Sequence, residues 1–213
     1  MTAIDDAVAA VLAGALIVFP TDTVYGLACR PDEPEVTDRV FEVKRRPKGL
    51  TLPVLVPSTA AAREIAVFDD RAQRLASELW PGALTIVLPR SRVSGPWALG
   101  GDDRSIGVRV PRQPLALAVL LEAGPLAVTS ANRSGEPPAR SCDTLHASFG
   151  DRVAVYLCQD DPLEGEPSTV IDLAHGDARL VRVGSIGDQL LHELLGAEAP
   201  LLDSPLPKAT PSR

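Results

Sequence analysis

The chain has 213 residues, of which 45% are apolar and 4% aromatic, and its formal net charge is −7. This length suits one large domain, whose core must be mostly aliphatic. The negative charge argues against a protein that coats nucleic acid, but it leaves room for a local basic pocket. Cys29, Cys142 and Cys158 are far apart and form no CxxC pair. We therefore expect no disulfide, no zinc site and a reducing, cytoplasmic environment.

Neither a leader nor a membrane segment is expected. The first six residues carry acidic side chains, unlike the basic start of a signal peptide. No apolar run approaches the roughly 18 residues that a bilayer-spanning helix needs. The sequence therefore favours a protein without membrane contact.

Helix and strand patterns alternate along the chain. Thr2 with Asp5 is typical of a helix start, and Gly14 stands where a helix end belongs. Apolar spacing predicts helices at residues 2–13, 35–43, 58–66, 70–79, 113–122, 141–149 and 187–195. Apolar or alternating runs predict strands at residues 15–19, 52–56, 84–88, 105–110, 125–128, 153–157, 168–173 and 178–183.

This order predicts a single-domain α/β fold with a twisted mixed sheet and flanking helices. Several connections between strands are too short for a crossover helix, so some neighbouring strands must be antiparallel. We expect the domain to span residues 1–196. Residues 197–213 hold four prolines and little periodicity, which is typical of a tail.

The usual catalytic motifs are missing. The sequence holds no GxxxxGK[ST] phosphate loop, GxGxxG fingerprint, GxSxG elbow or HExxH pair. The three histidines are isolated from one another, so neither a histidine triad nor a metal site is expected.

Polar side chains follow two of the predicted strands. Thr21, Asp22 and Thr23 come after residues 15–19, and Ser130 and Asn132 come after residues 125–128. Because ligands of open α/β sheets bind where strand ends open into loops, these groups suggest a pocket for an anion. The alternatives are an ordinary helix cap at the first place and an ordinary turn at the second.

Cations add to this pattern. Lys44 and Arg46 stand at the end of a predicted helix, where both could reach one ligand; a solvated basic patch is the alternative. Arg109 shares a strand face with Ser105, which leaves room for a ligand above the sheet. The alternative is that Arg109 lies on an exposed sheet face and forms an ion pair. The same two alternatives apply to Arg182, which also lies in a predicted strand.

Together these residues could hold a nucleoside triphosphate beside a small zwitterion. No nucleophile is evident among them. Phosphoryl or nucleotidyl transfer, which depends on positioning and charge, is therefore the reaction class that the residues favour.

Six motifs, in this order, resemble the YrdC family of threonylcarbamoyl-AMP synthases. They are Pro20-Thr21-Asp22-Thr23-Val24-Tyr25-Gly26-Leu27, Lys44-x-Arg46-Pro47, Pro81-Gly82-x-Leu84-Thr85, Val108-Arg109-Val110-Pro111, Ser130-Ala131-Asn132-x-Ser134-Gly135 and Pro167-Ser168-Thr169-Val170-Ile171-Asp172. The resemblance implies a twisted α/β sheet with a basic concave face. It also implies that L-threonine, bicarbonate and ATP form threonylcarbamoyl-AMP and pyrophosphate. A separate transferase complex would then modify tRNA.

The resemblance also implies residue roles. It places Lys44 and Arg46 at the reaction centre; Arg46, Leu50, Ser105, Ser130, Asn132, Pro138 and Arg182 on ATP; and Thr23, Leu55, Arg109, Val128 and Ser168 on threonine. Magnesium would be bound by the triphosphate of ATP, with no metal site formed by the protein.

Two departures from the family pattern are visible. Leu50 and Thr51 stand where members usually carry a polar residue and proline, and Leu55 where some carry His. We therefore expect contacts there to come from the backbone. The chain resembles the short, single-domain form. The main alternative is a module that binds double-stranded RNA or tRNA with the same basic face. A carbamoyl-transfer domain of the kind fused in hydrogenase-maturation proteins is a weaker alternative.

Overall fold

The computed structural model describes residues 2–160, 162–163, 165–196 and 202–203. Its helices are α1 (Ala3–Leu12), α2 (Pro34–Lys44), α3 (Thr59–Ile65), α4 (Asp70–Leu79), α5 (Pro114–Ala123), α6 (Cys142–Phe149) and α7 (Asp188–Leu195), with the 3-10 turn η1 (Gly150–Arg152) after α6. Its strands are β1 (Ile17–Phe19), β2 (Gly26–Cys29), β3 (Val54–Leu55), β4 (Leu84–Pro89), β5 (Ser105–Arg109), β6 (Leu126–Ser130), β7 (Val155–Tyr156), β8 (Thr169–Asp172), β9 (Arg179–Arg182) and β10 (Leu202–Asp203).

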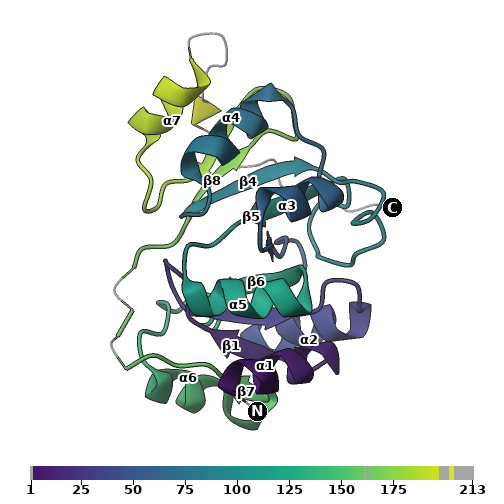
Figure 1. Ribbon diagram of the computed structural model, residues 1–213, viewed down its shortest axis with the longest axis vertical. Coiled ribbons are helices and arrows are strands. Elements are labelled where there is room, and N and C mark those ends of the chain that lie inside the picture. The colour runs from purple at the N-terminus through teal and green to yellow at the C-terminus, as the bar shows by residue number, and fades with distance from the viewer. Residues whose placement is uncertain (1, 161, 164, 197–201, 204–213) are drawn as a thin grey trace.

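The described strands form one mixed sheet in the order β10-β9-β8-β4-β5-β3-β6-β2-β1-β7 (Figure 1). The pairs β1–β7, β3–β5, β4–β8 and β9–β10 are parallel, and the other neighbours are antiparallel. The expectation of a mixed sheet in a single α/β domain is confirmed.

Helices pack against both faces of this sheet. α1 and α5 lie side by side (Figure 1), and they enclose one apolar cluster that includes Val11, Phe19 and Leu120. Val18 belongs to a second cluster, which extends to residues of α2, α3 and α4. Because side chains alternate across a strand, Val18 and Phe19 mark opposite faces of the sheet.

Local sequence signals place several helix ends as predicted. The Thr2 hydroxyl accepts a hydrogen bond from the Asp5 N–H, and the Asp5 carboxylate accepts one from the Thr2 N–H. The hydroxyls of Ser58 and Ser141 also cap α3 and α6, by accepting hydrogen bonds from the N–H groups of Ala61 and Thr144. Gly14 follows α1 with φ of 78°, a conformation that glycine adopts at little cost.

Strand β2, inside the domain, was not predicted. β2 follows the threonine-rich turn, and none of its residues is β-branched or aromatic, so nothing local indicates a strand. Its conformation depends on pairing with β1 on one side and β6 on the other. A Cβ on Gly26 would lie 2.6 Å from Val128 Cγ1, so glycine permits this close approach.

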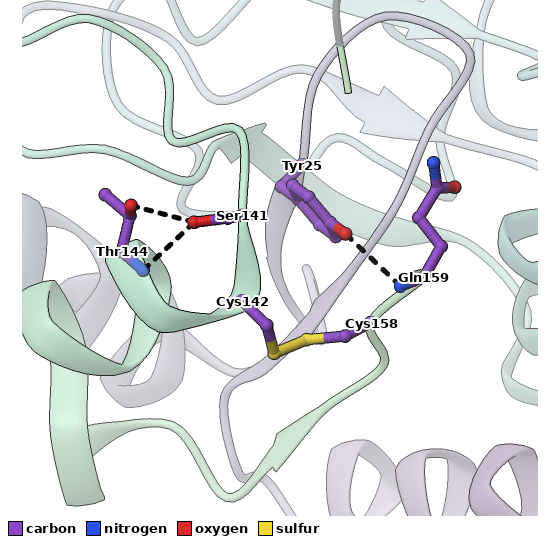
Figure 2. The surroundings of a disulfide bond; sticks show 6 residues. All are labelled: Tyr25, Ser141, Cys142, Thr144, Cys158 and Gln159. Carbon is purple, nitrogen blue, oxygen red and sulfur yellow. Dashed lines mark hydrogen bonds between the residues drawn. A yellow bond between two sulfur atoms is a disulfide. The ribbon is translucent and has the colours of Figure 1, made fainter. Parts of the chain in front are cut away.

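The expectation of no disulfide is wrong. Cys142 at the start of α6 is bonded to Cys158, with their Cα atoms 5.8 Å apart (Figure 2). The chain runs along α6, through η1 and back along β7, and this return brings the two cysteines together. Sixteen residues separate them, and the sequence pattern alone does not show that the chain reverses between them.

The predicted tail at 197–213 lies outside the described residues, except for Leu202–Asp203. Those two residues pair in parallel with β9 as strand β10. Among the helices that the structure describes, none is long and apolar enough to cross a membrane.

Candidate functional site

A cavity of about 970 Å³ opens on the sheet, at the upper end of the range for small-molecule sites. Residues from distant parts of the chain line it. Among them are the predicted site residues Thr23, Arg46, Leu50, Leu55, Ser105, Arg109, Val128, Ser130, Ser168 and Arg182. Three other predicted residues, Lys44, Asn132 and Pro138, do not line the cavity.

Strand β5 forms part of the cavity wall. Ser105, Gly107 and Arg109 line the cavity, whereas Ile106 and Val108 belong to the apolar core. This alternation is the one that the sequence predicts. A Cβ on Gly107 would meet Thr85 and Pro53 at 3.3–3.4 Å, so the neighbouring chain packs tightly against β5 here.

The threonine-rich segment forms a turn and does not cap a helix. The Thr21 hydroxyl donates to the Val24 carbonyl oxygen over 2.6 Å and accepts from the N–H groups of Thr23 and Val24. The hydroxyls of Thr21 and Thr23 lie 2.9 Å apart. The turn therefore holds Thr23 rigidly in the cavity wall, and the chain continues directly into β2.

Arg109 is held from three sides. Its guanidinium donates to the Gly82 carbonyl oxygen over 2.9 Å, to the Thr23 hydroxyl over 2.8 Å and to the Asp22 carboxylate over 2.7 Å. Only 4% of the residue is exposed, and burial lowers its pKa while Asp22 opposes that shift. Because Arg109 also lines the cavity, this fixed fork can receive a carboxylate.

Ser168 and Arg182 meet in another part of the cavity wall. Arg182 donates to the Ser168 carbonyl oxygen over 2.8 Å and to the Ser168 hydroxyl over 3.1 Å. The Ser168 hydroxyl also lies 2.9 Å from that of Thr85. The arrangement places two hydroxyls and an exposed cation together, a set that suits a polar and partly anionic ligand.

Lys44 and Arg46, predicted to reach one ligand together, diverge in the structure. Arg46 lines the cavity and donates to the Thr51 carbonyl oxygen over 3.0 Å. Burial and the nearby charge of Arg182 lower the pKa of Arg46. Within the described residues, neither arginine forms an ion pair with an acidic side chain. Their uncompensated charge is suited to binding an anion.

The Lys44 side chain turns into the protein instead. Its ammonium donates to the carbonyl oxygens of Ser130 and Asn132, the second over 2.6 Å, and lies 3.3 Å from the Asn132 side-chain oxygen. Lys44 is 1% exposed, and burial, followed by the charge of Arg46, lowers its pKa to about 7. Lys44 thus holds the turn that presents Ser130 to the cavity.

Asn132 is directed into the same turn. Its side-chain amide donates to the Arg133 carbonyl oxygen over 2.9 Å, and the Ser134 N–H donates to the Lys44 carbonyl oxygen over 2.8 Å. Gly135 has φ of 88°, as the sequence predicts for the turn. Asn132 therefore shapes the turn from within.

His175, which is far from the other histidines in the sequence, lies at the rim of the cavity. His175 Nδ1 lies 2.8 Å from the fully buried Asp172 carboxylate, and Nε2 lies 3.0 Å from that of Asp102. Burial lowers the pKa of His175, but its hydrogen bonds to Asp102 and Asp172 outweigh that effect and raise it overall. The link could not be seen in the sequence, because 73 residues separate His175 from Asp102.

Asp22 is a further residue whose role the sequence does not show. It was a candidate helix cap, but it accepts from both the Arg109 side chain and the Arg112 N–H. In the part of the chain that the structure describes, no group of three or more His, Cys, Asp or Glu side chains is placed to hold a metal ion.

Residues 9–184 match the sequence model of the Sua5/YciO/YrdC family, whose description reads "Telomere recombination". A protein of Mycobacterium tuberculosis is 35% identical over 194 residues, which cover 91% of this chain and 89% of that protein. The threonylcarbamoyl-AMP synthase of Chromohalobacter salexigens is 38% identical over 181 residues, covering 82% of this chain and 94% of that enzyme.

Solved structures show the same likeness. The crystal structure of Pyrococcus abyssi Sua5 complexed with L-threonine superposes with a TM-score of 0.86 at 32% identity. The match covers 93% of this chain and 58% of that chain, so the present chain spans less than two thirds of the Sua5 length.

Proposed function

The chain belongs to the Sua5/YciO/YrdC family, and on this premise we propose that it is a threonylcarbamoyl-AMP synthase. It forms threonylcarbamoyl-AMP and pyrophosphate from L-threonine, bicarbonate and ATP, for the threonylcarbamoyladenosine modification of tRNA. The observation that carries the proposal is the convergence of Arg46, Arg109 and Arg182 on one cavity. Threonine supplies one carboxylate and ATP a triphosphate, which together match these cations.

Threonine would bind to Thr23, Arg109 and Ser168, all of which line the cavity. The Arg109 guanidinium is held by Asp22, Thr23 and the Gly82 carbonyl, so it can receive the carboxylate with little loss of side-chain entropy. The hydroxyls of Thr23 and Ser168 offer partners to the threonine amine and hydroxyl. Leu55 and Val128 would provide the apolar and backbone contacts beside them.

ATP would bind on the side of Arg46 and Arg182. The two guanidiniums would meet the phosphates, with Ser105, Ser130 and the backbone near Leu50 as further partners. Asn132 and Lys44 would not contact ATP directly but would fix the turn that carries Ser130. The Lys44 ammonium would also add positive charge near the reacting phosphate. Pro138 follows this turn and would contribute shape alone.

The proposed reaction needs charge and position, and no protein nucleophile. The threonine amine would attack the carbon of bicarbonate to form a carbamate, with loss of one water molecule. A carbamate oxygen would then attack the α-phosphorus of ATP while pyrophosphate leaves. Negative charge grows on the phosphate oxygens, and the Arg46 and Lys44 cations would stabilise it. Arg109 would hold the threonine end still, so that the reacting atoms stay aligned.

Magnesium would enter with ATP as part of the substrate, because the hydroxyl and guanidinium groups of the cavity are poor ligands for it. The product would pass to a tRNA threonylcarbamoyl transferase complex in the cytoplasm. Direct contact with tRNA would be weak or indirect, since the net charge of the chain is −7.

The proposal is tested by incubating purified protein with Mg–ATP, bicarbonate and labelled threonine, and by seeking the labelled adenylate and pyrophosphate. Product must depend on all three substrates. Arg46→Ala should reduce turnover by roughly 100-fold or more, the scale seen when a group that stabilises a transition state is removed. The adjacent and exposed Arg45 gives a matched control, and Arg45→Ala should leave turnover unchanged.

Absence of the adenylate, under conditions in which the Chromohalobacter salexigens synthase makes it, would refute the proposed activity. Equal turnover in the wild type and in Arg46→Ala would refute the role of Arg46. Salt-dependent binding of RNA without any turnover would instead favour the RNA-binding module.

A further inference from the structure

The disulfide joins two chain segments that both flank the cavity. Cys142 follows the segment 130–141, which starts at Ser130 in the cavity wall and contains the turn held by Lys44. Cys158 opens the segment that leads to Ser168, also in the cavity wall. One covalent bond therefore ties together two sides of the site.

The segment after Cys158 contacts the threonine side of the cavity directly. The Gln159 N–H donates to the Tyr25 hydroxyl over 3.3 Å, and Figure 2 shows this hydroxyl pointing at the residue next to the bonded Cys158. Tyr25 lines the cavity. Farther along, a Cβ on Gly165 would lie 2.0 Å from the Thr23 carbonyl oxygen, so the two backbones touch.

A second, noncovalent link joins the same two segments. The Leu163 N–H donates to the Arg140 carbonyl oxygen over 3.0 Å, two residues before Cys142. Among the described residues, this is the only backbone hydrogen bond that joins the two segments. Breaking the covalent bond would leave a single weak tie, because an exchangeable hydrogen bond contributes little net stability.

The three cysteines differ in access. Cys142 and Cys158 are each partly exposed. Cys29 is fully buried, and burial raises its pKa to about 12. Because the thiolate is the attacking species, Cys29 takes no part in exchange at neutral pH. Thiol–disulfide exchange is therefore confined to Cys142 and Cys158.

We propose that Cys142 and Cys158 form a redox switch, in which the disulfide holds the threonine side of the cavity in its binding arrangement. A dithiol reductant supplies two electrons: the bond between the two cysteine sulfurs breaks, the sulfurs of the reductant bond to each other, and its two protons pass to Cys142 and Cys158. An oxidised dithiol reverses the step. The effect on catalysis rests on the proposed synthase activity.

Reduction frees residues 158–160, 162–163 and 165–168 from α6 and loosens the contacts of Gln159 with Tyr25 and of Gly165 with Thr23. The KM for threonine then rises roughly 3- to 10-fold, which is the scale of ordering one or two extra groups on binding. The KM for ATP changes less, because Arg46 lies outside both segments that the disulfide ties and is held by the Thr51 carbonyl oxygen.

The test compares the full chain after air oxidation and after treatment with dithiothreitol. Amide hydrogen exchange is followed by mass spectrometry over residues 130–141 and 158–168, and free thiols are counted. Threonine and ATP KM values are measured in both states. The variant Cys142→Ser/Cys158→Ser should behave as the reduced wild type in either state. Cys29→Ala is the matched control and should keep the full redox response.

Faster exchange in the two segments after reduction, absent from the double variant, supports the switch even if no adenylate is formed. Hydrogen exchange does not depend on turnover, so absence of synthase activity does not count against the switch. The inference is overturned if air-oxidised protein retains all its thiols. It is also overturned if exchange in these segments is equal in both states, or if the double variant still responds to dithiothreitol.

Discussion

The guanidinium of Arg109 donates a hydrogen bond of 2.8 Å to the hydroxyl of Thr23, although 86 residues separate them in the chain. Asp22 accepts a second bond from the same guanidinium, so a turn after β1 fixes a side chain on β5. The fork is oriented before any ligand arrives. Substrate binding then needs little rearrangement of this wall.

Replacing the carboxylate that orients Arg109 should weaken threonine binding. Asp22→Ala removes the acceptor for the guanidinium and for the Arg112 N–H. We expect the KM for threonine to rise roughly 10-fold, the equivalent of one lost charge-assisted hydrogen bond, with a smaller change for ATP. Asp32→Ala is the control, because Asp32 pairs with Arg30 on the surface. Equal changes in the two KM values would contradict the role.

The buried ammonium of Lys44 should matter for folding as well as for turnover. Lys44→Met leaves the carbonyl oxygens of Ser130 and Asn132 without their donor, and a buried unpaired carbonyl costs about 1–3 kcal/mol. We expect the free energy of unfolding in urea to fall by about that amount. Lys48→Met is the matched control, since the exposed Lys48 pairs with Asp38. A variant as stable as the wild type would contradict the structural role of Lys44.

Local patterns predicted much of the fold. The helix caps at Thr2 and Ser58 and the alternation along β5 each depend on residues within a few positions of one another. The same alternation places Arg109 and Ser105 on the cavity side. Such features are visible in sequence because the physics that sets them is local.

Other features could not be predicted, because each depends on a long-range contact. β2 becomes a strand only between β1 and β6. The inward turn of Lys44 depends on carbonyls more than 80 residues away, and the chain after α6 must reverse before Cys158 meets Cys142. The sequence indicates a set of cations for one site, but it does not show that Arg46, Arg109 and Arg182 line the cavity while Lys44 lies behind its wall.

The His175 link should make stability depend on pH. The pKa of His175 is raised in the folded state, so its contribution is fully present below about 6.5, the unfolded value. It is lost as the pH rises through the higher folded value. We expect the stability advantage over His175→Asn to fall by about 0.5–1 kcal/mol across this window, a modest value because solvent screens the rim.

Urea unfolding at several pH values checks this expectation. His192→Asn gives the control, because His192 lies exposed on α7. An advantage of wild type over His175→Asn that stays constant with pH, or that grows as the pH rises, would contradict the ion-pair reading of this link.

The contact between Gly165 and Thr23 allows a steric test of the threonine wall. A Cβ at residue 165 would lie 2.0 Å from the Thr23 carbonyl oxygen and 2.9 Å from the Thr23 Cα, and backbone atoms cannot rotate away. Gly165→Ala should therefore push the segment off the turn and raise the KM for threonine several-fold more than that for ATP. Gly187→Ala is the control, because a Cβ there meets nothing within 4 Å. Unchanged threonine kinetics in Gly165→Ala would show that this backbone contact does not position the site.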